Sequence, residues 1–248
     1  MKAVILAAGR GTRMGSLTES CPKPLLRIGG VPLLEHIASR LPREVDEFII
    51  VVGYLGHMIR DYCGDEFLGR RVRYVEDTEL KGTYRALEMA RPYLVEGERF
   101  FVLYADDIHG AYGLRECLKY ERALLVSWVE DPRPYGVVEL GRDNFVHSIE
   151  EKPENPKTNI VSTGVLLLDT NIFKYKPRLH PAKNEYFLAE AVADMLVDYP
   201  IAAVTSSLWL PVTTPEDLTR TEQVLPTTIE NMADSGPMGR WRIADWKF

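Results

Sequence analysis

Residue types that could do chemistry first gather between Gly9 and Arg13, where two glycines and two arginines lie within five positions. Glycine lets backbone N–H groups approach a ligand that a Cβ atom would hold away. Successive N–H groups in such a turn form a concave anion site, and the planar guanidinium of arginine binds phosphate through two hydrogen bonds. A further cation, Lys23, stands between two prolines a short distance along the chain. Together these residues predict a loop that grips the phosphates of a nucleoside triphosphate.

Three other interpretations of this loop can be compared with that one. The Rossmann fingerprint requires glycines at its first, third and sixth positions, and here Met14 occupies the sixth. The P-loop pattern that ends in Gly-Lys-Ser/Thr does not occur anywhere in the chain. An ordinary turn after a buried strand stays open as the alternative, although Arg13 and Lys23 make it less favourable.

Carboxylates form a second polar group. Asp106 and Asp107 come directly after the apolar run at 100–104 and Ala105. Ligands of open α/β sheets bind at the carboxyl ends of the strands, so these side chains are expected beside a ligand.

Alternating strands and helices must position these groups. Short, branched apolar runs predict buried strands, and helical spacing of apolar residues predicts the helices between them. The alternation predicts an α/β fold with a Rossmann-like, mainly parallel sheet sandwiched by helices. Strands are expected near 3–6, 48–52, 72–75, 100–104, 123–128, 165–168, 201–204 and 208–210, and helices near 33–41, 55–62, 82–94, 187–196 and from 214 onward.

The domain organisation follows from changes in character along the chain. Residues 1–226 are expected to form one domain, with a small β-rich insertion at about 130–163, where prolines, glycines and alternating residues predict hairpins. Residues 227–248 form a C-terminal tail in which Gly236-Pro237 interrupts the chain and Trp241 and Trp246 offer apolar anchors. A flexible tail and a segment docked on the domain or on a partner subunit are equally favoured.

Composition excludes several classes of protein. The chain has 248 residues, 46% hydrophobic and 27% charged, and a formal charge of −6, which argues against a broad nucleic-acid footprint. Its three cysteines are scattered without a CxxC pair, so neither a disulfide framework nor a zinc site is expected. No apolar run is long enough to span a membrane, and no signal peptide is recognised. We therefore expect a cytoplasmic protein with no membrane partner.

The motifs, taken in order, carry a resemblance. Leu6–Met14 followed by Pro22–Leu25 resembles the N-terminal signature of the sugar-1-phosphate nucleotidyltransferases. Further matches over about residues 1–220 follow in the order of that family: Gly82-Thr83, Asp106, Tyr135–Val138, Glu151–Pro153, Thr163-Gly164 and Trp209. The segments around Tyr135 and Glu151 most resemble glucose-1-phosphate thymidylyltransferases, with mannose-1-phosphate guanylyltransferases next.

The resemblance implies a reaction. The implied partners are a nucleoside triphosphate and a sugar 1-phosphate, which would react to give pyrophosphate and an NDP-sugar. The enzyme would be a hexose-1-phosphate thymidylyl-, uridylyl- or guanylyltransferase. The attacking oxygen belongs to a phosphate monoester, whose second pKa is about 6, so no general base is required. The implied cofactor is Mg²⁺, and a homo-oligomer, dimer or tetramer, is expected.

The resemblance also implies roles for individual residues. Arg13 would span the triphosphate, Lys23 would hold the α-phosphate and the sugar phosphate, and Asp106 would bind Mg²⁺. The nucleotide-binding residues would be Leu6, Ala7, Ala8, Gly9, Gly11, Thr12, Asp77, Gly82 and Thr83. The sugar-phosphate-binding residues would be Tyr135, Gly136, Glu151, Lys152, Thr163, Gly164 and Trp209.

Two positions depart from the family pattern. Asp77 stands where relatives usually carry glutamine or glutamate, which leaves the nucleobase open. Pro211 stands where a second metal ligand is expected, and proline has no side-chain oxygen. One alternative is therefore a catalytically impaired paralogue that binds nucleotide-sugar as a regulatory or scaffold subunit. Another is a glycosyltransferase that binds metal through Asp106 and Asp107.

Overall fold

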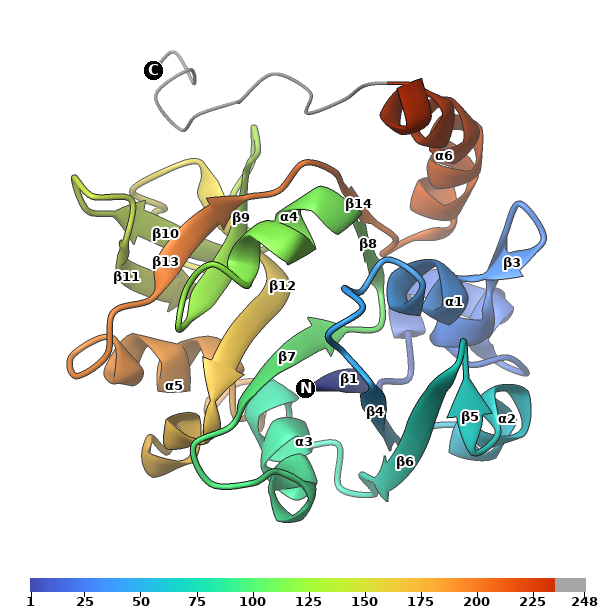
Figure 1. The fold of residues 1–248 in the computed structure, drawn as a ribbon, viewed down its shortest axis with the longest axis horizontal. Helices are drawn as coiled ribbons and strands as arrows, with labels where there is room; N and C mark the ends of the chain where they lie inside the picture. The colour runs from blue at the N-terminus through green and yellow to red at the C-terminus, as the bar shows by residue number, and fades with distance from the viewer. Residues whose placement is uncertain (235–248) are drawn as a thin grey trace.

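A ten-stranded sheet forms the centre of the computed structural model, which describes residues 1–234 (Figure 1). Its middle consists of β7 (Arg99–Tyr104), β1 (Lys2–Ala7), β4 (Glu47–Val52) and β6 (Arg70–Glu76), in that order. Each of these strands runs parallel to its neighbour. Their carboxyl ends therefore meet at one edge of the sheet, where loops from distant parts of the sequence can build a common site.

The side of the sheet beyond β7 is antiparallel. The long strand β12 (Ile160–Asp169) pairs antiparallel with β7, with β9 (Ala123–Trp128) and with β10 (Gly136–Leu140). Strand β11 (Val146–Glu151) forms a hairpin with β10, β13 (Ala202–Thr205) runs parallel to β9, and β5 (Glu66–Phe67) pairs antiparallel with β6 at the other edge. The predicted α/β fold is confirmed, with a mixed sheet that is parallel in its centre. Strands β10 and β11 lie in the predicted insertion and extend the main sheet through β12.

Helices cover both faces of the sheet because successive side chains of a strand point in opposite directions. Ala3 and Ile5 of β1 pack into the apolar cluster that includes Leu34, whereas Val4 packs with Leu87 on the opposite face. The first face is covered by α1 (Leu33–Ala38), α2 (Gly56–Cys63) and α4 (Ala111–Cys117). The second is covered by α3 (Thr83–Ala90) and α5 (Leu188–Met195), as Figure 1 shows.

Short elements complete the edge at which the strands end. A two-stranded ladder of β8 (Asp107–His109) and β14 (Trp209–Pro211) follows β7 and precedes the last helix. A second ladder joins β2 (Arg27–Ile28) and β3 (Val31–Pro32). The 3₁₀ helices are η1 (Thr12–Thr18), η2 (Lys23–Leu25), η3 (Arg91–Tyr93) and η4 (Thr170–Lys174).

Helix α6 (Pro215–Asp234) passes through the predicted boundary between residues 226 and 227, so no change of secondary structure marks the start of a tail there. The first turn of this helix carries two acids, Glu216 and Asp217, which favour the positive end of the helix dipole. Trp241 and Trp246 lie outside the described residues, and the division into a domain and a tail stays a prediction. Within residues 1–234, none of the helices has the length and apolar character needed to cross a membrane.

Candidate active site

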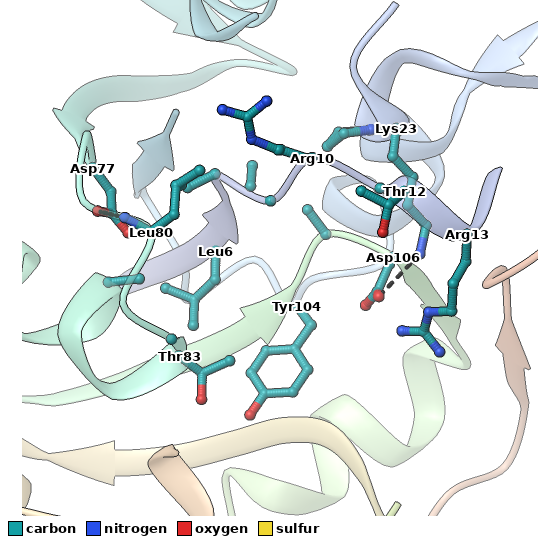
Figure 2. A pocket seen from close by; sticks show the side chains of 18 of the residues that line it. Leu6, Arg10, Thr12, Arg13, Lys23, Asp77, Leu80, Thr83, Tyr104 and Asp106 are labelled. Atoms are coloured by element: carbon teal, nitrogen blue, oxygen red, sulfur yellow. Dashed lines mark hydrogen bonds and ion pairs between the residues drawn. The ribbon is translucent and has the colours of Figure 1, made fainter. Parts of the chain in front are cut away.

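A pocket of about 560 Å³ opens at the carboxyl ends of β1, β6 and β7. Every residue predicted for nucleotide binding or catalysis lines it, namely Leu6, Ala7, Ala8, Gly9, Gly11, Thr12, Arg13, Lys23, Asp77, Gly82, Thr83 and Asp106. Lys23 and Arg13 lie at one end of the pocket and Asp77 at the other, with Arg10 between them, as Figure 2 shows. The fold thus brings these residues together, while their individual roles in binding stay predictions.

The glycine loop owes its shape to Gly11, which lies in the left-handed region at φ 64° and ψ 33°. Its carbonyl accepts hydrogen bonds from the Met14 N–H (2.9 Å) and from the hydroxyl of buried Thr18 (3.1 Å). A Cβ atom at this position would lie only 3.0 Å from the Cβ of Lys23. Gly11 therefore both makes the turn and lets the loop approach the segment that carries Lys23.

Lys23 is held by the rigid segment around it. The Pro22 carbonyl accepts a hydrogen bond from the Leu25 N–H, and Pro24 fixes the next backbone angle, which together form the single 3₁₀ turn η2. Lys23 is 8% exposed, and its ammonium lies 3.0 Å from Asp106 Oδ2 (Figure 2). With Arg13 nearby on the pocket wall, this end of the pocket presents two cations and one carboxylate. Such a set suits a phosphate chain and a hard cation.

Apolar side chains and one carboxylate form the opposite end of the pocket. Leu6 and Leu80 lie beside Asp77 on the pocket wall (Figure 2). Gly53 allows this end to close, because a Cβ there would lie 2.8 Å from the backbone oxygens of both Ala8 and Asp77. The backbone directly after β4 therefore packs against the two loops that form this end.

The β8–β14 ladder supports Asp106 from behind. Asp107 lies opposite Pro211 in the register of the ladder, and its Oδ2 accepts a hydrogen bond from Trp209 Nε1 at 3.0 Å. Burial, together with the adjacent charge of Asp106, raises the pKa of Asp107 well above its usual range. His109 donates from Nε2 to the Thr163 carbonyl at 2.8 Å, and burial lowers its pKa to about 4.

Residues predicted to bind the sugar phosphate do not line this pocket but lie on β10, β11, β12 and β14 or, for Tyr135 and Lys152, directly beside a strand end. The rings of Tyr135 and Trp209 meet edge to face with centroids 5.1 Å apart. Glu151 and Lys152, which are neighbours in the sequence, form an ion pair of 3.0 Å, and the Lys152 N–H donates to the Tyr135 carbonyl at 3.0 Å. Gly136 pairs with Glu151 across the β10–β11 hairpin. These side chains therefore form one cluster around the hairpin.

Thr163 and Gly164 are neighbours on β12, but their surroundings differ. Thr163 is 1% exposed, and its hydroxyl donates to the Leu125 carbonyl at 3.1 Å, so its side chain is a packing group without a free polar atom. Gly164 has φ 82°, and a Cβ there would lie 2.8 Å from the ring of Tyr104, a pocket residue. This geometry therefore disfavours a contact between the Thr163 side chain and a sugar.

Comparison with known proteins identifies the family. The family model described as "Nucleotidyl transferase" matches residues 2–227. The chain belongs to this family. It is 32% identical over 227 residues to the bifunctional protein GlmU of Methanocaldococcus jannaschii, covering 91% of this chain and 54% of that protein. This chain thus spans about half the length of the first curated relatives it matches.

Two further similarities cover nearly whole proteins. The UTP–glucose-1-phosphate uridylyltransferase AglF of Haloferax volcanii is 33% identical over 239 residues, covering 91% of this chain and 96% of that protein. A crystal structure described as a "Putative Glucose-1-Phosphate Thymidylyltransferase from Bacillus anthracis in Complex with a Sucrose" has a TM-score of 0.80 and 24% identity, covering 90% of this chain and 94% of that chain. The second similarity shows the fold of the nucleotidyl transferase family in this chain.

The donor set of this family member fits a divalent cation bound by few protein ligands. Asp106 is the carboxylate at the cationic end of the pocket, beside Lys23, and Pro211 offers no side-chain oxygen. Within residues 1–234, no three His, Cys, Asp or Glu side chains gather into a cage for a metal ion. A Mg²⁺ ion keeps several waters and takes oxygens from substrate phosphates, so one or two carboxylates beside a phosphate site suffice.

Some pocket residues were not predicted from the sequence. Leu80, Tyr104 and Glu185 also line the pocket, as does Thr213, which the sequence offers as a substitute for the metal ligand missing at Pro211. Tyr104 ends the strand that leads to Asp106, so its position in the sequence could have indicated it. Glu185 precedes α5 by only a few residues but is far from every motif in the sequence, and only the tertiary structure brings it to the pocket.

Proposed function

We propose that this protein transfers a nucleotidyl group from a nucleoside triphosphate to a sugar 1-phosphate, releasing pyrophosphate and forming an NDP-sugar. The observation that carries the proposal is a single pocket in which a glycine loop, Arg13 and the Lys23–Asp106 pair face one another. Membership of the nucleotidyl transferase family and the similarity to AglF over nearly its whole length support it.

The proposed nucleotidyl transfer requires that the two substrates are positioned for reaction and that the charge of their phosphates is neutralised. The nucleophile is an oxygen of the sugar phosphate, which is already ionised near neutral pH, and it attacks the α-phosphorus while pyrophosphate leaves. The backbone N–H groups of the loop from Gly9 to Gly11 and the guanidinium of Arg13 stabilise the charge that develops on the leaving pyrophosphate. No side chain needs to act as a general base.

Lys23 draws the two phosphate groups together. Its ammonium is buried beside Asp106, so it acts where water weakens the attraction least. With substrates bound, the lysine would donate to phosphate oxygens and Asp106 would hold the metal. Bound Mg²⁺ supplies further neutralisation of phosphate charge. The sugar lies towards Tyr135, Gly136, Trp209 and the Glu151–Lys152 pair, with Gly164 giving room beside Tyr104.

Pro211 motivates the alternative of a binding subunit without turnover. It lies opposite Asp107 in the β8–β14 ladder, next to Asp106. The alternative predicts tight binding of NDP-sugar, no pyrophosphate release and a gain of activity in Pro211→Asp. A glycosyltransferase would instead bind the NDP-sugar better than the free triphosphate.

A matrix of substrates tests the proposal. Purified protein with Mg²⁺ is mixed with each of ATP, CTP, GTP, UTP and dTTP and with several hexose 1-phosphates, and pyrophosphate release is measured. At least one pair should turn over, and Lys23→Met should lower kcat about 10²- to 10³-fold, as expected for the loss of one preorganised charge. Lys119→Met is the matched control, because Lys119 is 64% exposed on the surface. No release with any pair, from protein that binds triphosphate, would refute catalytic turnover.

The oligomeric state is a separate proposal. A dimer or tetramer is expected from the resemblance alone, and light scattering on the full chain would measure it.

A further inference from the structure

Asp77 is a buried carboxylate with one oxygen that accepts hydrogen bonds within the protein and one that does not. Its side chain is 2% exposed, yet it lines the pocket. Oδ1 accepts hydrogen bonds from the N–H groups of Glu79 (3.1 Å) and Leu80 (2.9 Å). Among the described residues, no group donates to Oδ2, and Oδ2 is not one of the atoms sealed away without a partner. Oδ2 is therefore an acceptor that faces the pocket.

The position of this oxygen is fixed by its surroundings. The Asp77 N–H donates to the Val52 carbonyl at 2.8 Å, and the backbone of Asp77 packs against Gly53. Rotating the carboxylate away would break both hydrogen bonds that close the turn to Leu80. The pocket thus presents a preorganised acceptor rather than an adaptable side chain.

The place of Asp77 in the pocket indicates which part of the substrate it meets. The cations that suit phosphates, Arg13 and Lys23, lie at the far end (Figure 2). Around Asp77 the pocket walls include the apolar side chains of Leu6 and Leu80, which suit the faces of a flat aromatic base, and Arg10 lies between this end and Lys23. With the triphosphate at the cationic end, the edge of the nucleobase meets Asp77.

The chemistry of a carboxylate discriminates between bases. A carboxylate oxygen only accepts hydrogen bonds. Guanine offers two adjacent donors on its pairing edge, the ring N–H and the exocyclic amine. Uracil and thymine offer one N–H between two carbonyl oxygens, and adenine and cytosine place an acceptor nitrogen beside their amine. A carbonyl or ring nitrogen held against a buried carboxylate is left without a donor, which disfavours those bases.

We propose that Asp77 makes this pocket selective for a guanine nucleoside triphosphate. The inference rests on the proposed nucleotidyl transfer and names the nucleotide that it uses. Guanine donates to Oδ2, while Oδ1 keeps the turn to Leu80 closed.

The test compares nucleotides in the wild-type protein and in Asp77→Asn. The substitution keeps the shape of the side chain and an oxygen for the turn, but it replaces the open acceptor by an N–H donor. The kcat/KM for GTP should exceed that for UTP by roughly tenfold to hundredfold in the wild type, and the ratio should invert in Asp77→Asn. Titration calorimetry of GTP and UTP, without sugar phosphate, measures the same preference as affinity. Asp65→Asn, at an exposed position, is the matched control.

Each outcome decides the inference. A wild type that prefers UTP, dTTP, ATP or CTP overturns it, and so does an Asp77→Asn variant with an unchanged ratio. The wild-type ratio decides even if the variant does not fold. If no pair of substrates turns over, the proposed function fails, but calorimetry still shows whether guanine is preferred.

Discussion

Lowering the pH below 6.5 is expected to destabilise this protein through His109. The imidazole is 2% exposed, and Nε2 must carry the proton because its partner, the Thr163 carbonyl, can only accept. Nδ1 is buried without a hydrogen-bond partner, and burial outweighs the backbone hydrogen bonds with Thr163 and Asp107 and the charge of Asp106, which favour the protonated ring. Burial accordingly lowers the pKa of His109 from 6.5 to about 4.

The sign and size of the effect follow from linkage. Between pH 6.5 and 4 the unfolded chain binds a proton at this histidine and the folded protein does not, so stability falls as the pH falls. At pH 5 the loss is about 2 kcal/mol, and below pH 4 it levels off at about 3 kcal/mol. Above pH 6.5 the contribution of His109 to the pH dependence disappears.

The assay is urea unfolding from pH 8 to pH 4, with wild type compared with His109→Gln. Glutamine can still donate to the Thr163 carbonyl but does not titrate. Between pH 8 and pH 5, the free energy of unfolding of the variant should therefore fall by about 2 kcal/mol less than that of the wild type. For a chain of this size, the Tm of the variant should fall by about 4–8 °C less than the Tm of the wild type. His147→Gln, at an exposed position on β11, should behave as wild type. Identical pH profiles for wild type and His109→Gln would refute the reasoning.

Two further predictions concern residues around the pocket. Gly164→Ala should cost about 1–3 kcal/mol and raise KM, because its φ of 82° disfavours a side chain and the new Cβ would meet the Tyr104 ring. Gly69→Ala has a similar φ of 73° but open space, so urea unfolding and kinetics of the two variants separate backbone strain from the contact with Tyr104; equal effects would exclude that contact. Asp107→Ala removes the acceptor for the Trp209 indole and should raise KM for the sugar phosphate about tenfold, whereas Asp107→Asn keeps an acceptor and should change it far less. Equal losses in both Asp107 variants would show that the negative charge, rather than the hydrogen bond, is what matters.

The sequence by itself determined the local features of this protein. The apolar run of β1 and the glycine loop after it are neighbours in the chain, so the position of an anion-binding turn at the end of a strand could be predicted. The alternation of strands and helices likewise predicted the parallel centre of the sheet, because each crossover depends mainly on local patterns.

Only the tertiary structure decided which distant groups meet. Lys23 and Asp106 are separated by 83 positions, and their 3.0 Å contact depends on β1 and β7 being neighbours in the sheet. Thr163 is a plausible sugar contact in the sequence, but the pairing of β12 with β9 buries its hydroxyl on Leu125. Asp77 is one acid among many until its turn fixes one oxygen and leaves the other facing the pocket. Spacing along a chain cannot supply such orientations, because they arise from contacts between elements that fold together only in three dimensions.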